Sequence, residues 1–131
     1  MYLLRFQLAV VYVFGAVAKI NPDWLLHAQP LRIWLGANVD LPLLGPWLEL
    51  PWVAYTASYA GLAFDACIVP LLLTRRTRAL AYACVLAFHL LTAALFPIGM
   101  FPWLMIGLTP IFFAADWPRR WLSRFGVLVA L

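Results

Sequence analysis

Charged side chains are scarce in this chain of 131 residues. They make up 11% of it, against 66% hydrophobic residues, and only five are acidic. Such an apolar composition cannot cover a globular domain with a water-compatible surface, which excludes a soluble enzyme or binding module. The sequence therefore predicts an integral membrane protein. Its length allows one small helical bundle, so residues 1–131 are expected to form a single membrane domain.

Cysteine is scarcer still, with two residues in the chain. Cys67 and Cys84 both lie within apolar runs. A free thiol is the ordinary state there, so the two residues predict no disulfide framework. The net charge of +4 is small, and no aromatic-interleaved basic groove accompanies it. Nucleic acid is therefore not expected as a partner. No metal site is predicted either.

Long apolar runs are what the chain has instead. They cover residues 2–20, 53–73, 79–96 and 99–115. Each is close to the ~20 residues that cross ~30 Å of hydrocarbon. Pro97, Gly99 and Pro102 interrupt the apolar sequence where the last two runs meet and leave room only for a short turn, so 79–115 predicts a helical hairpin. The predicted fold is all-α, with four transmembrane helices plus interfacial amphipathic helices.

The arginines give this bundle an orientation. They lie at both outer ends of the hairpin and are absent from its turn. The positive-inside rule then places both hairpin ends in the cytoplasm, and with them the amino and carboxyl termini of a multi-pass protein. Seven of the nine basic residues fall inside in this arrangement, while Lys19 and Arg32 fall outside.

The segments between the runs predict shorter helices. Asn21-Pro22-Asp23 has the pattern of a helix start, with Asn21 as the N-cap, Pro22 at the first position and Asp23 in the first turn. An extracytoplasmic loop over residues 21–52 is expected to carry a broken amphipathic helix in the headgroup layer. Residues 117–131 predict a cytoplasmic interfacial helix.

Three ionisable residues lie within or at the end of predicted spans. Lys19, Asp65 and His89 each share a helical stripe with small or polar residues, so all three are expected to face the bundle. Ionisable groups in hydrocarbon are costly and therefore mark sites by default. Counted by helical rise, Lys19 and His89 are expected to line one cavity open to the outer face. Asp65 is expected to lie deeper, where it orients His89 or is satisfied by it.

Each residue also has a structural interpretation. A lysine at a helix end is often an anchor that reaches into the headgroups. A single histidine in a membrane helix is as often an interhelical hydrogen-bond partner as a catalytic group, and a buried aspartate can be purely structural.

Several segments together resemble a known family. They are GAVAKINPDW at 15–24, the acid Asp65, FHLLTAALFPIGMFPWLMI at 88–106 and DWPRR at 116–120. This ordered set is similar to the membrane domain of the vitamin K-dependent gamma-glutamyl carboxylase family, whose bacterial members are called HTTM proteins. The resemblance covers residues 8–122 and implies a bacterial inner-membrane location.

The resemblance implies a chemistry and a set of roles. Lys19 stands where the family has the base that deprotonates reduced vitamin K or a similar quinol. The quinol anion reacts with O2, the resulting base removes a glutamate γ-proton, and the carbanion captures CO2. The base must act as an uncharged amine, which an apolar surrounding favours. His89 would donate to an oxyanion or orient the base. The expected supporting residues are Asp65, Asp23 and Trp24, and the ring would lie between Phe96, Phe101 and Trp103.

The family also has elements that this sequence does not contain, namely further membrane helices and, in eukaryotes, a large lumenal domain that binds the peptide. Besides the lipid bilayer, we therefore expect other membrane subunits or a separate soluble domain as partners. Two non-enzymatic alternatives remain. One is a membrane subunit, because the first helix loosely resembles that of DoxX-type four-span proteins at Arg5, Phe14, Gly15 and Lys19. The other is a purely structural membrane component.

Overall fold

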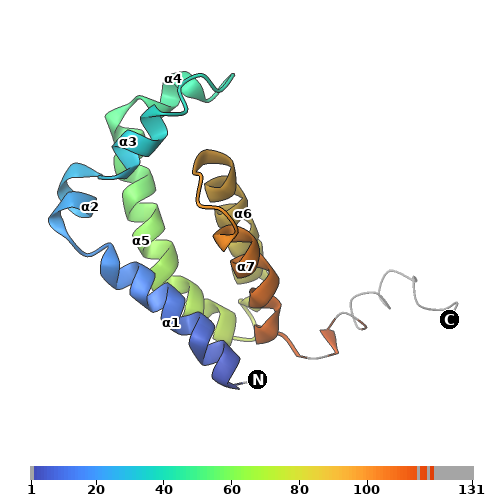
Figure 1. Cartoon of the computed structure of the whole chain (residues 1–131). Helices are drawn as coiled ribbons and strands as arrows, with labels where there is room; N and C mark the ends of the chain where they lie inside the picture. The colour runs from blue at the N-terminus through green and yellow to red at the C-terminus, as the bar shows by residue number, and fades with distance from the viewer. Residues whose placement is uncertain (1, 115, 118, 120–131) are drawn as a thin grey trace, which may run out of the picture.

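The protein is all-helical in the part of the chain that the structure describes. The computed structural model describes residues 2–114, 116–117 and 119, and Figure 1 shows their arrangement. The main helices are α1 (Tyr2–Ala18), α5 (Pro51–Leu73), α6 (Arg78–Leu95) and α7 (Phe101–Leu108), which the 3-10 helix η1 (Thr109–Phe112) continues. The predicted all-α class is confirmed, and the first three main helices begin and end within two residues of the predicted runs.

These helices form two arms. α5 contacts α1 on one side and α6 on the other, while α6 and α7 lie side by side as the predicted hairpin (Figure 1). At the end of the molecule where the chain begins, η1 contacts both α1 and α6 and joins the two arms. At the opposite end α5 extends beyond α1 and is covered by the short helices α2 (Pro22–His27), α3 (Leu31–Gly36) and α4 (Gly45–Leu48).

Two apolar clusters hold the fold together. The larger one joins α1, α5, α6, α7 and η1 through buried side chains that include Leu8, Leu72, Val85 and Phe112. The smaller one joins the segment around α2, α3 and α4 to the first turns of α5, and Leu31, Leu35 and Ala54 belong to it. The site described below is lined by residues of both clusters.

The connection after α1 follows the predicted helix start. The side chain of Asn21 accepts a hydrogen bond from the backbone N–H of Trp24 at 2.9 Å, and Pro22 takes the first helical position. Ala28 then adopts a left-handed conformation with φ of 51°, and a cis peptide bond joins Gln29 to Pro30. The predicted broken helix is therefore two helices, α2 and α3.

The last predicted run is shorter as a helix than expected. The sequence predicts a span over 99–115, but α7 ends at Leu108 and continues only as η1. Pro110 has no backbone N–H to donate to the carbonyl of Ile106 four residues earlier, so the α-helical ladder stops there. The Tyr82 hydroxyl donates to that carbonyl instead, at 3.4 Å.

The number of helices able to cross a membrane is accordingly smaller than predicted. Among the described residues, α5 and α6 are long and apolar enough to do so, whereas Tyr2–Ala18 and Phe101–Phe112 are apolar but shorter. The predicted interfacial helix at 117–131 lies outside the described residues, apart from Trp117 and Arg119.

Arg5 and Arg78, which belong to the arginines predicted on the cytoplasmic side, also cap the carboxyl ends of helices. Arg5 donates from Nε to the carbonyl of Ile111 at 2.8 Å and from a terminal nitrogen to that of Phe113 at 3.3 Å. Arg78 donates in the same way to Leu72 and Leu73, at 2.7 and 2.9 Å. Cations stabilise the free carbonyls at the carboxyl end of a helix. Both arginines lie at the end of the molecule where the chain begins.

Candidate functional site

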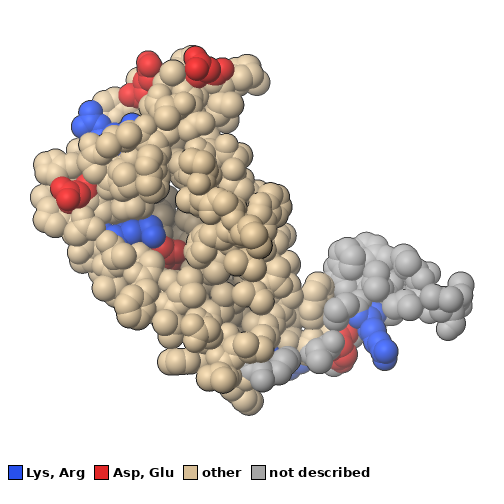
Figure 2. All heavy atoms as spheres, in the orientation of Figure 1, with Lys and Arg blue, Asp and Glu red and all other residues tan. Residues whose placement is uncertain are grey.

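A cavity opens between the two arms. Its volume is about 300 Å³, and its walls come from α1, α2, α3, α5, α6, α7 and the turn before α7. Figure 2 shows this face of the molecule hollowed, with basic and acidic atoms side by side within the hollow. Most of the lining is apolar and much of it aromatic. The aromatic rings that line it belong to Tyr12, Trp24, Trp34, Phe88, Phe96 and Phe101.

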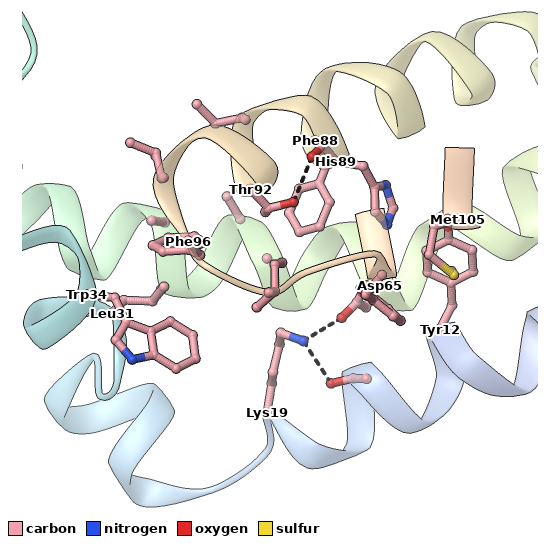
Figure 3. Close-up of a pocket in the computed structure, with 18 of the residues that line it drawn as sticks. Tyr12, Lys19, Leu31, Trp34, Asp65, Phe88, His89, Thr92, Phe96 and Met105 are labelled. Atoms are coloured by element: carbon pink, nitrogen blue, oxygen red, sulfur yellow. Dashed lines mark hydrogen bonds and ion pairs between the residues drawn. The ribbon is translucent and has the colours of Figure 1, made fainter. Parts of the chain in front are cut away.

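An ion pair forms the polar end of the cavity. Lys19 Nζ lies 2.6 Å from Asp65 Oδ2 and also donates to the carbonyl of Gly15 at 3.2 Å (Figure 3). The two side chains are 19% and 9% exposed, so the pair is largely removed from water. An ammonium has three N–H donors, and two of those of Lys19 are used here. The third is left for a group inside the cavity.

A glycine on α1 lets these two side chains meet. A Cβ atom on Gly15 would lie 2.7 Å from Asp65 Oδ2, which is too close, whereas one on Gly61 would make only an ordinary contact, 3.8 Å from Cε of Lys19. Small residues allow helix backbones to approach closely. The small-residue stripes predicted on the first and second spans are therefore the surfaces where the ion pair forms.

The pairing of Lys19 with Asp65 differs from the depths expected from the sequence. Helical rise placed Asp65 deeper than both Lys19 and His89, and the expected partner of Asp65 was His89. The first part of α5 packs against α2 and α3 beyond the end of α1 (Figure 1). Asp65, further along α5, therefore lies beside Gly15 in the last turn of α1. The long lysine stem closes the remaining gap, because Lys19 directly follows α1 and is free to turn inward.

Trp24 forms a fixed wall beside the lysine. Its indole Nε1 donates to the Ser58 carbonyl at 2.8 Å, and the Ser58 hydroxyl donates back to the Trp24 carbonyl at 2.6 Å. Lys19 Nζ lies 5.0 Å from the centre of the tryptophan ring, within the range of a cation–π contact. These bonds between α2 and α5 hold the ring against the cavity.

His89 faces the same cavity from α6. Its Nδ1 lies 2.9 Å from the carbonyl of Val85, one turn earlier in the helix. Figure 3 shows the ring pointing from α6 toward the side of Asp65 and Tyr12. It is only 2% exposed. Four aromatic rings, at centroid distances between 5.3 and 6.2 Å, surround it: Tyr12, Phe64, Phe88 and Phe101.

The other predicted site residues divide into two groups. Phe96 and Phe101 line the cavity, as does Trp24. Trp103 does not line it and is 59% exposed, because a residue two positions after Phe101 is turned by about 200° around the helix. Asp23 is exposed in the first turn of α2 and does not reach the cavity, although a carboxylate suits that end of a helix.

Some lining residues were not predicted. Trp34 stands at the mouth of the cavity, where its ring lies 5.5 Å from that of Phe96. Nothing in the sequence shows that α3 docks near the end of α6, so Trp34 could be interpreted only as an interfacial residue. Thr92 and Phe88 are neighbours of His89 on α6 and could have been included by helical spacing.

The polar groups of the cavity suit an organic ligand. No group of three or more His, Cys, Asp or Glu side chains within the described residues could hold a metal ion. The cavity offers an amine, a carboxylate and an imidazole at one end, and aromatic surfaces elsewhere. An apolar cavity with a few polar groups gathered at one end has the character of a small-molecule site.

By its fold and its cavity, the chain is a small all-α protein with a buried lysine–aspartate pair in an apolar site. The particular family follows from comparison with known families. The chain belongs to the HTTM domain family, whose model matches residues 1–117. HTTM is a membrane domain, and it suggests that the chain is a carboxylase-related membrane domain. No solved structure matches the chain.

Proposed function

We propose that the chain binds a quinol in this cavity and takes part in the quinol-dependent carboxylation of peptidyl glutamate. The observation that carries the proposal is the Lys19–Asp65 pair, buried at the polar end of an aromatic cavity in an HTTM domain. Reduced vitamin K is the quinol of the family that the sequence resembles.

The shape of the cavity supports a ring with an apolar tail. A volume of about 300 Å³ is at the lower end of the range for ligand sites, so it holds a fused ring but not a long chain. Leu91, Ile98 and Phe101 line the opening and are also exposed on the surface. An apolar mouth of this kind faces lipid tails more favourably than water. The ligand would therefore enter sideways from the bilayer and leave its tail there.

The ion pair supports an acid–base role. When bound, the quinol supplies, together with O2, the base that removes a γ-proton from glutamate, after which CO2 adds to that carbon. Lys19 Nζ lies within direct proton-transfer distance of Asp65 Oδ2, at 2.6 Å. A proton passed to Asp65 leaves a neutral amine, which takes a proton from the quinol hydroxyl. Asp65 then acts as the partner that makes Lys19 available as a base.

We also propose the membrane arrangement. In it α1 and the α7–η1 segment cross as the two shorter members of a four-span bundle, with both termini in the cytoplasm of a bacterium. Arg5 and Arg78 support it, because the structure brings them to one end of the bundle. The cavity then lies toward the outer face. The peptide would be brought there by another membrane subunit or a separate soluble domain.

The proposal is tested by CO2 incorporation. The chain is reconstituted in lipid nanodiscs with reduced vitamin K, O2, labelled bicarbonate and a glutamyl peptide, both alone and with the products of neighbouring open reading frames. We expect quinol-dependent label in the peptide, reduced at least about 100-fold in Lys19→Met, as for loss of a general base. The matched control is Arg32→Met, which removes an exposed cation and should keep full activity.

A second function is supported by the same ion pair. Lys19 and Asp65 join α1 to α5 whether or not a ligand binds, as they would in a non-enzymatic membrane subunit of DoxX-like or structural type. Equal labelling by Lys19→Met and the unaltered chain would contradict the assigned base. An absence of label under every condition would favour the subunit.

A further inference from the structure

We propose that His89 makes the cavity select a ligand hydroxyl over a carbonyl, and thus a reduced quinone over an oxidised one. The inference rests on the proposed function, because it concerns the ligand of the same cavity. It gives His89 the role of a hydrogen-bond acceptor, in contrast to the donor role expected from the sequence.

The backbone of α6 fixes which ring nitrogen of His89 carries the proton. A carbonyl oxygen only accepts hydrogen bonds, so the contact of 2.9 Å with Val85 requires the proton on Nδ1. In the neutral ring Nε2 is then a bare lone pair. Nε2 has no hydrogen-bond partner within the part of the chain that the structure describes, and the residue lines the cavity.

The surroundings hold the ring in this state. His89 is 2% exposed and enclosed by aromatic rings, and turning the imidazole over would give up the bond to Val85. The charged group that faces it from α5 is Asp65, whose Oδ2 is occupied by Lys19. Tyr12 faces it from α1.

A bare nitrogen distinguishes the two redox states of a quinone. A hydroxyl donates to Nε2, whereas a carbonyl oxygen at the same place brings two acceptors together and leaves both unsatisfied. Lys19, as the ammonium of the ion pair with Asp65, does not discriminate in this way, because an N–H donor bonds a hydroxyl oxygen and a carbonyl oxygen alike. Selection for the hydroxyl form therefore depends on His89.

The test uses a redox-inert pair of probes, 1-naphthol and 1-methoxynaphthalene, which differ by the hydroxyl proton and a methyl group. Equilibrium dialysis measures their binding to the full chain in nanodiscs, with empty nanodiscs as the background. We expect the naphthol to bind about tenfold more tightly than its ether, as for one buried hydrogen bond. The ratio should fall to about one in His89→Phe and to an intermediate value in His89→Gln. His27→Gln, at an exposed histidine on α2, should keep the full ratio.

Nitrogen NMR of the imidazole provides a measurement that needs no ligand. With 15N-histidine and His27→Gln to remove the second signal, we expect Nδ1 of His89 to be protonated and Nε2 to be unprotonated.

The outcomes separate the two proposals. Equal binding of both probes by the unaltered chain, a preference that persists in His89→Phe, or a protonated Nε2 would each overturn the selection by His89. All three leave the quinol cavity itself in place. Binding of neither probe would contradict the cavity's proposed function and the selection together.

Discussion

Gly15 is where α1 comes closest to the buried carboxylate. A Cβ atom there would lie 2.7 Å from Asp65 Oδ2 and 3.2 Å from its Cγ. We expect Gly15→Ala to displace the Asp65 side chain from Lys19 and to cost about 1–3 kcal/mol, as overpacking does in closely packed interiors. The measurement is unfolding by denaturing detergent, together with naphthol binding, which should weaken.

Gly107 provides the matched control for that substitution. It lies within α7, and a Cβ atom there meets nothing within 4 Å. Gly107→Ala should therefore stabilise the protein by about 0.5–1 kcal/mol through helix propensity alone. Effects of the same sign for the two variants would mean that the close contact at Gly15 does not hold the carboxylate.

The burial of the Lys19–Asp65 pair is only weak evidence that the pair stabilises the fold. Removing two charges from water costs about as much as their attraction returns, and apolar replacements of such pairs are often neutral or stabilising. The pair also crosses between helices next to a cavity rather than within the apolar clusters. Its position at the cavity supports a chemical role more than a structural one.

Arg5 acts at the level of whole elements, because it connects α1 to η1 and the residue that follows it. Its guanidinium bonds the carbonyls of Ile111 and Phe113, which the short η1 helix leaves free. We expect Arg5→Gln to lower the free energy of unfolding by about 2 kcal/mol, since hydrogen bonds to charged groups are among the stronger ones. Hydrogen exchange should increase at the amides of η1.

Arg76 tests whether charge alone explains that effect. It is exposed and makes no hydrogen bond within the described residues, yet it belongs to the same predicted cytoplasmic group. Arg76→Gln should change stability by less than about 0.5 kcal/mol. If it destabilises the protein as much as Arg5→Gln does, Arg5 is not a specific cap.

The docking of α2 on α5 is the second feature at this scale. Besides the Trp24–Ser58 bonds, the hydroxyls of Tyr55 and Tyr59 donate to the carbonyls of Leu26 and Leu25, at 2.8 and 2.9 Å. The left-handed Ala28 that ends α2 leaves several carbonyls without helical donors. Side chains of α5 satisfy them, so the segment after Lys19 is held against the helix that carries Asp65.

At the scale of the whole molecule, the cavity lies where the two arms separate. η1 joins α1 and α6 at one end, and the other end of α5 is covered by α2, α3 and α4. A ligand that fills the space between the arms would link α1, α5 and α6. We expect bound naphthol to raise the midpoint of thermal unfolding, because a ligand of the native state stabilises it by mass action.

The proposed orientation is tested by cysteine accessibility. In a background with Cys67→Ser and Cys84→Ser, single substitutions are made at two exposed positions, Asp40→Cys and Arg76→Cys. A membrane-impermeant maleimide added to intact bacterial cells should label the variant at position 40 and not the one at position 76. Labelling of both, or of position 76 alone, would show that the positive-inside assignment is wrong for this chain.

Much of the fold could be predicted because its causes are local. The lengths of the apolar runs predicted both ends of α1, α5 and α6 to within two residues, and Asn21-Pro22 predicted the start of α2. The break at Pro110 was local too and was overlooked, because hydropathy over 99–115 carries no information on a missing backbone donor. The small-residue stripes were identified by helical spacing, and they mark the surfaces that meet.

The sequence by itself determined helices α1, α5 and α6, their polar stripes and the three ionisable residues. Only the tertiary structure decided that Lys19 pairs with Asp65, 46 positions away. It likewise brought Trp34 on α3 to the mouth of the cavity, beside Phe96. The physical reason is that spacing along one helix fixes which residues share a face. How far one helix is shifted along another depends on packing between residues distant in the chain.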